Sequence, residues 1–190
     1  QCLDAELRIL ESLWGETLGR ECVVQATVSH QHIYGLLFRL LWPLCTGRPF
    51  AAYTQHYPET LIAEVLLHAR TVIVSSPSQL KRFSPTMDLR TASTKIAAIF
   101  SSGGPLPLDA AKAWQRHLGQ PPIEVLGSTE TGGIAWRRQH DSASAWIPLP
   151  SVHVYTDIEQ ALFVTSPFTG HRDPQPTGDL ACLQDNGEFL

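Results

Sequence analysis

The feature that most constrains the fold is the alternation of short β-branched runs with helix-patterned segments over the first two thirds of the chain. Apolar runs that predict buried strands lie at 22–28, 71–74, 96–100 and 123–126. Segments with helical spacing of apolar residues lie around and between them, at 3–18, 32–42, 61–69 and 109–118. Alternation of this kind is typical of βαβ units. The sequence therefore predicts an α/β fold with a mostly parallel sheet and flanking helices.

The pattern changes after about residue 133. Short strand-like runs follow, and Pro, Gly and Ser separate them; the runs lie at 134–136, 152–155, 161–164 and 179–183. Such runs are typical of antiparallel hairpins. We therefore expect an α/β subdomain over residues 1–133 and a short antiparallel β lobe over residues 134–190.

Charge and apolar composition exclude several classes of partner. The 18 acidic and 14 basic residues give a net charge of −4 without charge blocks, so nothing favours nucleic acid or an anionic membrane. The most apolar stretch, 33–45, is shorter than the roughly 20 residues of a membrane span, and it contains Arg39. We interpret it as a core helix, which Pro43 and the turn at Thr46-Gly47 are expected to stop. The 4 cysteines form no CxxC pair, which favours free thiols and a cytoplasmic location.

Two glycine-rich segments directly follow predicted strands, at 101–105 and 127–133. Ligands of open α/β sheets bind beyond the carboxyl ends of the strands, and glycine exposes backbone N–H groups to phosphate oxygens. Within the second segment Thr129 offers a hydroxyl to a phosphate, and Glu130 offers a hard oxygen to Mg²⁺. The alternative is a pair of tight turns with incidental polar residues. The residues alone leave both interpretations open.

His30 and His32 form an HxH pair that suggests a second kind of site. They are candidate ligands of a metal-dependent hydrolase, although the pair is also compatible with one surface histidine and one polar residue at a helix start. No third ligand follows at a telling spacing. The sequence lacks the motifs of serine hydrolases (G-x-S-x-G), P-loop kinases (G-x-x-x-x-G-K-[ST]) and dehydrogenases (G-x-G-x-x-G).

Four separated segments, in order, resemble the adenylate-forming (AMP-binding) superfamily of acyl- and aryl-CoA synthetases, luciferases and peptide-synthetase adenylation domains. QHIYGL at 31–36 resembles F-H-I-Y-G-L, and SGGPL at 102–106 resembles S-G-G-A-P-L. LGSTETG at 126–132 resembles Y-G-x-T-E-x-G, and TGDL at 177–180 resembles the superfamily's T-G-D-L motif. The resemblance implies an ATP- and Mg²⁺-dependent ligase that adenylates a carboxylate. The acyl group would then pass to a thiol, of CoA or of the phosphopantetheine on an acyl carrier protein.

The resemblance also implies a role for each matching residue. Thr129 would hold the α-phosphate and Glu130 would bind Mg²⁺, which makes them the catalytic pair. Asp179 would accept hydrogen bonds from the ribose, and Glu124 would face the adenine amino group. The remaining nucleotide contacts would come from Gly103, Gly104, Pro105, Leu126 and Gly127. The carboxylate substrate would lie against His32, Tyr34, Gly133 and Ile134.

The sequence departs from the superfamily pattern in ways that limit what it can do alone. Leu126 replaces an aromatic residue, so adenine would rest on an aliphatic face. A phosphate-gripping loop with its Lys is expected before residue 1, and a small domain with a catalytic Lys after residue 190. We therefore interpret the chain as the central fragment of the large domain and predict that it is inactive by itself.

The substrate is predicted less closely than the reaction. The run at 30–39 resembles ligases of aryl-polyene pigment clusters, which favours an aryl carboxylate over a medium acyl chain. A non-catalytic module that keeps the fold for protein contacts is a further alternative.

Overall fold

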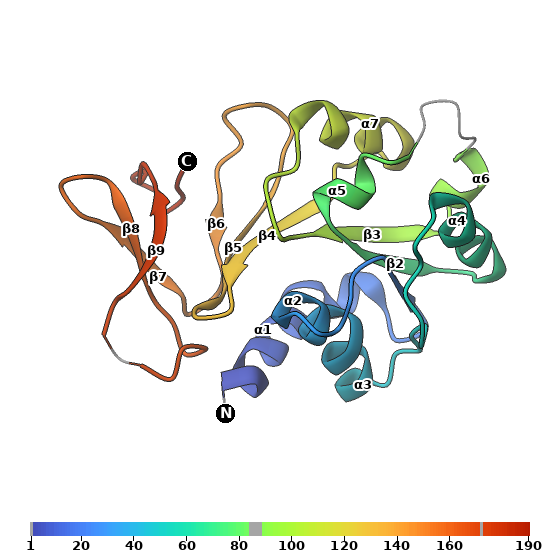
Figure 1. Cartoon of the computed structure of the whole chain (residues 1–190), viewed down its shortest axis with the longest axis horizontal. Helices are drawn as coiled ribbons and strands as arrows, with labels where there is room; N and C mark the ends of the chain where they lie inside the picture. Colours follow the sequence, from blue (N-terminus) through green and yellow to red (C-terminus); the bar gives the residue numbers. More distant parts are fainter. Residues whose placement is uncertain (1, 84–88, 172) are drawn as a thin grey trace.

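In the computed structural model, which describes residues 2–83, 89–171 and 173–190, the chain forms a six-stranded and a three-stranded sheet (Figure 1). The first sheet has the order β1-β2-β3-β4-β5-β6, with β1 to β4 parallel and β5 and β6 antiparallel. Its strands are β1 (Val23–Ala26), β2 (Thr71–Ser75), β3 (Ile96–Ser101), β4 (Ile123–Ser128), β5 (Gly132–Arg138) and β6 (Ile147–Pro148). The α/β class and the mostly parallel sheet are thus confirmed.

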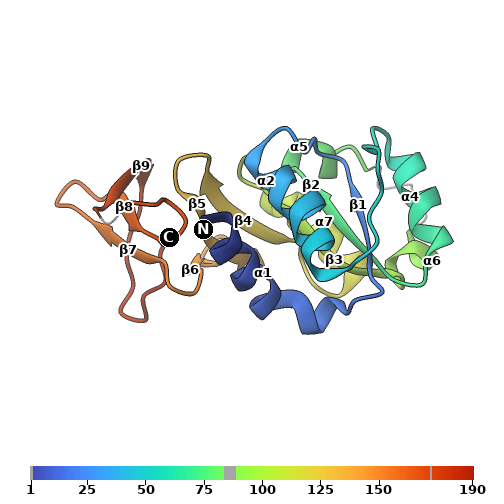
Figure 2. The ribbon, with the colours of Figure 1, turned by 90° about the horizontal axis from the view of Figure 1, so that it is seen from below.

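Helices cover both faces of the six-stranded sheet (Figures 1 and 2). One face carries α1 (Cys2–Leu18), α2 (Ile33–Gly35), the π-helix η1 (Leu36–Leu41) and α3 (Trp42–Thr46). The other carries α4 (Pro58–Leu67), α5 (Pro77–Leu80), α6 (Arg90–Ser93) and α7 (Leu108–Leu118). The strands are therefore buried from both sides, and every residue of β2 is buried. No helix within the described residues is long and apolar enough to cross a membrane.

The helical segment after β1 differs from the prediction. Pro43 was expected to end it, but the backbone stays helical from Ile33 to Thr46, and Gly47 ends it with φ 72°. The Trp42 N–H bonds the Leu37 carbonyl five residues back, so the π-helix changes the hydrogen-bond register just before the proline. Proline is tolerated at the first positions of a new helical turn, because its missing N–H has no partner to lose there. The prediction of a stop at Pro43 was wrong for this reason.

Arg39 explains how a charged residue fits this apolar helix. Its side chain is buried, and its guanidinium donates hydrogen bonds to the carbonyls of Val28 and Ala52 and to the Thr54 hydroxyl, at 2.6–3.0 Å. Burial without a carboxylate partner lowers its pKa. Arg39 therefore ties η1 to the chain that leaves β1, just before His30 and His32.

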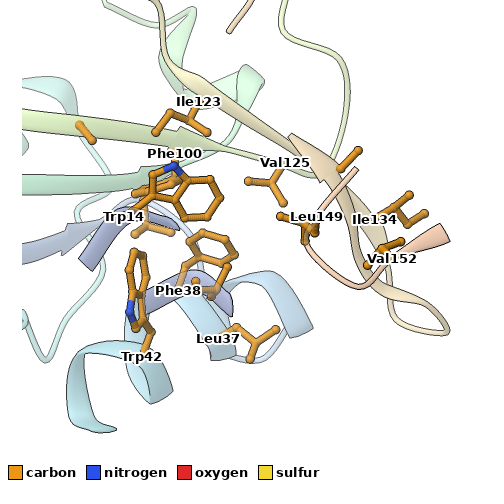
Figure 3. Packing of buried hydrophobic residues seen from close by; sticks show 14 of the residues in the cluster. Trp14, Leu37, Phe38, Trp42, Phe100, Ile123, Val125, Ile134, Leu149 and Val152 are labelled. Carbon is orange, nitrogen blue, oxygen red and sulfur yellow. The ribbon is translucent and has the colours of Figure 1, made fainter. Parts of the chain in front are cut away.

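An aromatic cluster packs this helical layer against the sheet (Figure 3). Trp14 of α1 contacts Phe100 of β3 edge-on at 5.0 Å between ring centroids, and Phe38 of η1 lies 5.1 Å from the same ring. Trp42 completes the cluster. Aromatic pairs of this kind contribute about 0.5–1.5 kcal/mol each beyond the area they bury. The cluster fixes α1 and η1 over the carboxyl half of β3, where the first glycine-rich segment begins.

The remainder of the chain forms the β lobe. β7 (His153–Thr156), β8 (Ala161–Thr165) and β9 (Gln175–Leu180) make an antiparallel sheet at one end of the molecule (Figures 1 and 2). Most of β5 and all of β6 follow residue 133, but both strands belong to the first sheet. The second sheet therefore starts at His153. The last strand was expected at 179–183 and lies earlier, because Leu183 pairs with Phe189 in a separate bridge.

Candidate active site at the carboxyl edge of the sheet

Segments far apart in the sequence meet at a hollow beyond the carboxyl ends of β3 and β4. It has about 290 Å³ of empty space, part of which is open to solvent. The walls come from α1, from the start of the helical segment after β1, from the end of β3 and from the β4–β5 hairpin. The lining residues are Glu6, Ile33, Tyr34, Leu37, Phe38, Ser102, Val125, Gly127, Ser128, Gly132 and Gly133.

The second glycine-rich segment is the tight turn of the β4–β5 hairpin. Gly127 pairs with Gly133, and a Cβ at Gly127 would collide with the Gly132 carbonyl oxygen. Gly132 has φ 68°, in the left-handed region that glycine adopts without strain. The glycines therefore allow two backbones to approach closely at the edge of the hollow.

Ser128 and Thr131 hold the turn together, and sequence reasoning missed both. The Ser128 Oγ accepts hydrogen bonds from the N–H groups of Glu130 and Thr131, each at 3.2 Å. The two hydroxyls lie 3.1 Å apart, and the Ser128 N–H donates to the Thr131 Oγ1. A Ser and a Thr three residues apart around a turn are a signal for such bonds. These two backbone N–H groups are thus used inside the turn, which leaves side chains as the outward-facing groups.

Thr129 and Glu130 occupy the tip of this turn, and both are exposed. A hydrogen bond from Ser128 lowers the pKa of the Glu130 carboxyl, so the group is ionised at neutral pH. An ionised, exposed carboxylate beside a hydroxyl is a donor set suited to Mg²⁺ and phosphate. Neither residue lines the hollow itself; the pair lies exposed in the turn between Ser128 and Gly132, which do line it.

The first glycine-rich segment is pinned to β4 by two side chains. The buried Ser102 donates to the Val125 carbonyl at 2.8 Å, and the Leu106 N–H donates to Glu124 Oε2 at 2.9 Å. Gly103, Gly104 and Pro105, predicted to contact the nucleotide, lie exposed between these two anchors.

The Glu124 carboxylate is buried and hydrogen-bonded within the protein, which the sequence did not indicate. Its side chain is 2% exposed, and the Arg137 Nε donates to its Oε1 at 2.9 Å. Arg137 in turn lies over the ring of Trp146, 4.2 Å from the centroid. With Leu106 on the other oxygen, Glu124 has no carboxylate oxygen without a hydrogen bond. An adenine amino group would therefore have to share an oxygen with one of these donors.

The predicted substrate residues fall into two groups. Tyr34 and Gly133 line the hollow, whereas the Ile134 side chain belongs to the hydrophobic core and His32 is exposed where its helix begins. The ring of Tyr34 packs on Phe38 at 5.0 Å. Its buried hydroxyl lies near the Ser75 backbone without a well-formed hydrogen bond, and burial raises its pKa well above the ordinary range.

Leu126 and Asp179 lie outside this hollow. Leu126 is half-buried and packs against the core next to the turn. Asp179 is exposed on β9, in the second sheet, and its N–H bonds the Thr177 hydroxyl at 3.1 Å. Three of the four motif segments therefore contribute residues to the hollow, and the fourth comes from the β lobe.

Glu6 is the lining residue that sequence reasoning missed altogether. It is 3% exposed, and its Oε1 accepts the Gly133 N–H at 2.8 Å. Burial raises the pKa of its carboxyl to about 7, and the Gly133 hydrogen bond lowers it by less. The signal was available, because Glu6 stands four residues before Leu10 and eight before Trp14 on the buried face of α1.

The histidine pair gains no support as a metal site. His30 and His32 are both exposed. Over residues 2–83, 89–171 and 173–190, no group of three or more His, Cys, Asp or Glu side chains could hold a metal ion. The hydrolase alternative therefore lacks a third ligand in the part of the chain that the structure describes.

Comparison with known proteins decides the family. A family model described as "AMP-binding enzyme" matches residues 7–161, which is most of the chain and includes the β4–β5 hairpin and every residue that lines the hollow except Glu6. This chain belongs to the AMP-binding enzyme family. The resemblance inferred from the four motifs is thereby confirmed.

Individual relatives agree with that assignment. The 4-coumarate–CoA ligase of Cereibacter sphaeroides is 28% identical over 130 residues, which cover 66% of this chain and 29% of that protein. ATP-bound MatB from Rhodopseudomonas palustris superposes with a TM-score of 0.83 at 19% identity, over 99% of this chain and 42% of that one. A benzoate CoA ligase from Burkholderia xenovorans LB400 superposes with a TM-score of 0.77 at 20% identity, over 98% of this chain and 45% of that one. The amide bond synthetase McbA from Marinactinospora thermotolerans superposes with a TM-score of 0.82 at 18% identity, over 99% of this chain and 44% of that one.

These superpositions show the fold of an AMP-binding enzyme and no more, because the identities are low. The chain spans less than half the length of these solved structures and 29% of the curated relative. Within that span, the chain has a mostly parallel sheet, glycine-rich segments at its carboxyl edge and an attached antiparallel β lobe.

Proposed function

We propose that this chain is the central part of an ATP-dependent carboxylate ligase, which joins a carboxylate to AMP and then transfers the acyl group to a thiol. Family membership supports a ligase of the acyl-CoA synthetase kind. The observation that carries the finer proposal is the hollow. Three motif segments that are far apart in the sequence contribute Tyr34, Ser102 and Gly132 to its lining.

The reaction would begin with attack of a substrate carboxylate oxygen on the α-phosphorus of ATP, releasing pyrophosphate. The substrate's apolar part would lie in the hollow, with its carboxylate directed towards the hairpin tip. There Thr129 would donate a hydrogen bond to the α-phosphate and Glu130 would hold Mg²⁺, which neutralises charge as it develops on the phosphate oxygens. The chain's own contribution is mainly to position two anions for reaction.

The nucleotide base and sugar would lie along the first glycine-rich segment. Gly103 and Gly104 leave space for a ligand to approach the backbone, because a Cβ at either would meet no atom within 4 Å. Gly127 would contribute through its backbone, since the side where its Cβ would lie faces the Gly132 carbonyl oxygen. Leu126 would offer the adenine an aliphatic surface, and Asp179 would accept from the ribose hydroxyls. Glu124 would act chiefly by holding the Ser102–Leu106 segment, and any contact with the adenine amino group would be shared with Arg137.

The acyl acceptor is proposed to be the thiol of CoA or of the phosphopantetheine on an acyl carrier protein. The CoA ligases among the relatives favour CoA. We also propose a cytoplasmic location, supported by 4 cysteines that are all free. An aryl acid is preferred over a medium acyl chain, since the rings of Tyr34 and Phe38 form part of the hollow's wall.

ATP–pyrophosphate exchange in the complete polypeptide that carries this chain, driven by a panel of aryl and aliphatic acids, tests the proposal. Glu130→Gln should lower exchange and raise the Mg²⁺ concentration required, and Thr129→Val should lower exchange. Glu159→Gln, an exposed change before β8, should alter neither. We propose that the 190-residue chain alone supports no exchange.

Two results would contradict the proposal. Exchange with none of the acids, together with failure of the complete protein to bind a non-hydrolysable acyl-adenylate mimic in calorimetry, would remove the ligase assignment. Binding of the mimic without exchange would instead favour a non-catalytic module that keeps the fold for protein contacts.

A further inference from the structure

Glu6 is the sole charged side chain among the residues that line the hollow. It belongs to the buried face of α1, where Leu10, Trp14 and Leu18 follow it at four-residue spacing and pack into the core. A fourth apolar residue would continue that stripe at no electrostatic cost. Burial of a carboxyl instead disfavours its charged form, and a single hydrogen bond compensates for this only partly. Packing alone therefore does not explain why a carboxyl group occupies this position.

The β4–β5 hairpin is shaped around this carboxyl. A Cβ added at Gly132 would lie 2.9 Å from Glu6 Oε2, and one added at Gly133 would lie 2.9 Å from Oε1. The same positions also face Phe168, whose Cβ would lie 2.9 Å from a Cβ at Gly132, and Leu149, whose Cδ1 would lie 2.7 Å from a Cβ at Gly133. Two glycines at the start of β5 thus leave room for Glu6 together with these two side chains.

The two carboxyl oxygens are in different situations. Oε1 accepts the Gly133 N–H at 2.8 Å. Oε2 receives no hydrogen bond from any residue that the structure describes, and it is not among the buried polar atoms without a partner. An anchoring role for the hairpin uses Oε1 alone. Oε2 is left without a described donor, on a residue that lines the hollow.

The other walls indicate what could reach this acceptor. Ile33, Leu37, Phe38 and Val125 are apolar, and the Tyr34 ring packs on Phe38. Walls of this kind suit the flat or aliphatic body of an acid, with one polar group to fix its orientation. A substrate group that pairs with Oε2 of the ionised carboxylate must donate a hydrogen bond. Hydroxyl and amino groups can do so, whereas a substrate carboxylate would be repelled.

We propose that Glu6 is a specificity-determining residue of the acyl pocket, whose Oε2 accepts a hydrogen bond from a hydroxyl or amino group at the far end of the carboxylic acid substrate. This inference rests on the proposed function, because the hollow is an acyl pocket only if the chain belongs to a carboxylate ligase. Sites built to hydrogen-bond a substrate group discriminate strongly against analogues that lack it, because the buried partner is then left unpaired.

The test compares pairs of acids in the complete protein: benzoate with its 3- and 4-hydroxy and 4-amino derivatives, and cinnamate with its 4-hydroxy derivative. The readout is the ratio of kcat/KM between the substituted and unsubstituted acid of each pair. We expect the wild type to prefer at least one donor-bearing acid by about 10- to 100-fold. Glu6→Leu should bring that ratio close to one, and Glu159→Gln should leave it at the wild-type value.

Glu6→Gln separates recognition from anchoring. The amide oxygen still accepts the Gly133 N–H, so the hairpin keeps its anchor, but an uncharged group faces the substrate. The donor preference should fall severalfold in this variant, and it decides the matter if Glu6→Leu does not fold. An unchanged ratio in Glu6→Gln and Glu6→Leu would overturn the inference, as would a wild type that favours the unsubstituted acids.

Failure of the proposed function gives a different result. In that case no acid supports pyrophosphate exchange in the wild type, whatever the residue at position 6. Direct binding of the same pairs, measured by calorimetry, then judges Glu6 alone. If the ratio of dissociation constants between the two acids of a pair falls close to one in Glu6→Leu, the site is supported. If this ratio is the same in the wild type and in Glu6→Leu, the site is rejected.

Discussion

Replacement of Glu6 by Gln should stabilise the chain, and the gain should grow with pH. Burial raises the pKa of the Glu6 carboxyl from its ordinary value of 4.5 to about 7, and no charged neighbour contributes to this change. The folded state therefore holds the proton more tightly than the unfolded chain does. Below pH 4.5 the group is protonated in both states and carries no penalty. As the pH rises towards 7, the unfolded chain loses the proton first, so the folded state loses stability.

The magnitude follows from the same two values. The interval between 4.5 and about 7, at about 1.4 kcal/mol per pH unit, corresponds to a full penalty of about 3 kcal/mol above pH 7. At pH 5 the penalty is only about 0.8 kcal/mol by the same relation. Glu6→Gln removes the ionisation and keeps an oxygen for the Gly133 N–H. The variant should thus gain little at pH 5 and up to about 3 kcal/mol at pH 8.5.

Urea unfolding of the 190-residue chain at pH 5, 7 and 8.5, followed by tryptophan fluorescence, measures this difference. Glu159→Gln is the matched control, because it makes the same chemical change at an exposed position. A stability difference between Glu6→Gln and the wild type that is the same at all three pH values would refute the reasoning. So would a variant that is less stable than the wild type at pH 8.5.

Three further changes test other parts of the site. Arg137→Met leaves the Glu124 carboxylate buried without its ion-pair partner, which should cost about 3–5 kcal/mol in urea unfolding; recovery of stability when Glu124→Gln is added would confirm the cause. Glu130→Gln changes an exposed group and should leave the unfolding midpoint unchanged while it weakens Mg²⁺-dependent exchange in the complete protein. Gly35→Ala would bring a Cβ into collision with the Ser29 carbonyl oxygen and should destabilise the chain by about 1–3 kcal/mol, and a wild-type midpoint would contradict this.

Local patterns in the sequence determined the strands and most of the helices. β2 is a continuous β-branched run and is buried throughout, and α7 ends at Gly119 with φ 76°, as a glycine after a helix predicts. Signals of this kind depend on a residue and its near neighbours, so one sequence is enough to interpret them. The glycine-rich segments were found in the same way, because short-range turn chemistry defines them.

Apolar patterns in the sequence failed where backbone hydrogen bonding decided the outcome. The helix did not end at Pro43, because the π-helix before it shifted the hydrogen-bond register. β5 joined the first sheet rather than the β lobe, because it pairs with β4 across a tight turn. The spacing of apolar residues along the sequence does not reveal either effect.

The candidate site divides along the same line. The sequence by itself indicated Thr129 and Glu130, since residue type and a turn context suffice to suggest phosphate and magnesium chemistry. Only the tertiary structure paired Glu124 with Arg137, and only it brought Glu6 to Gly133, 127 residues further along the chain. Burial and hydrogen bonding across such separations set the charge state of a carboxyl. The sequence therefore supplied the chemical groups at this edge of the sheet, and the fold decided which carboxylates are ion-paired, exposed or buried beside the hollow.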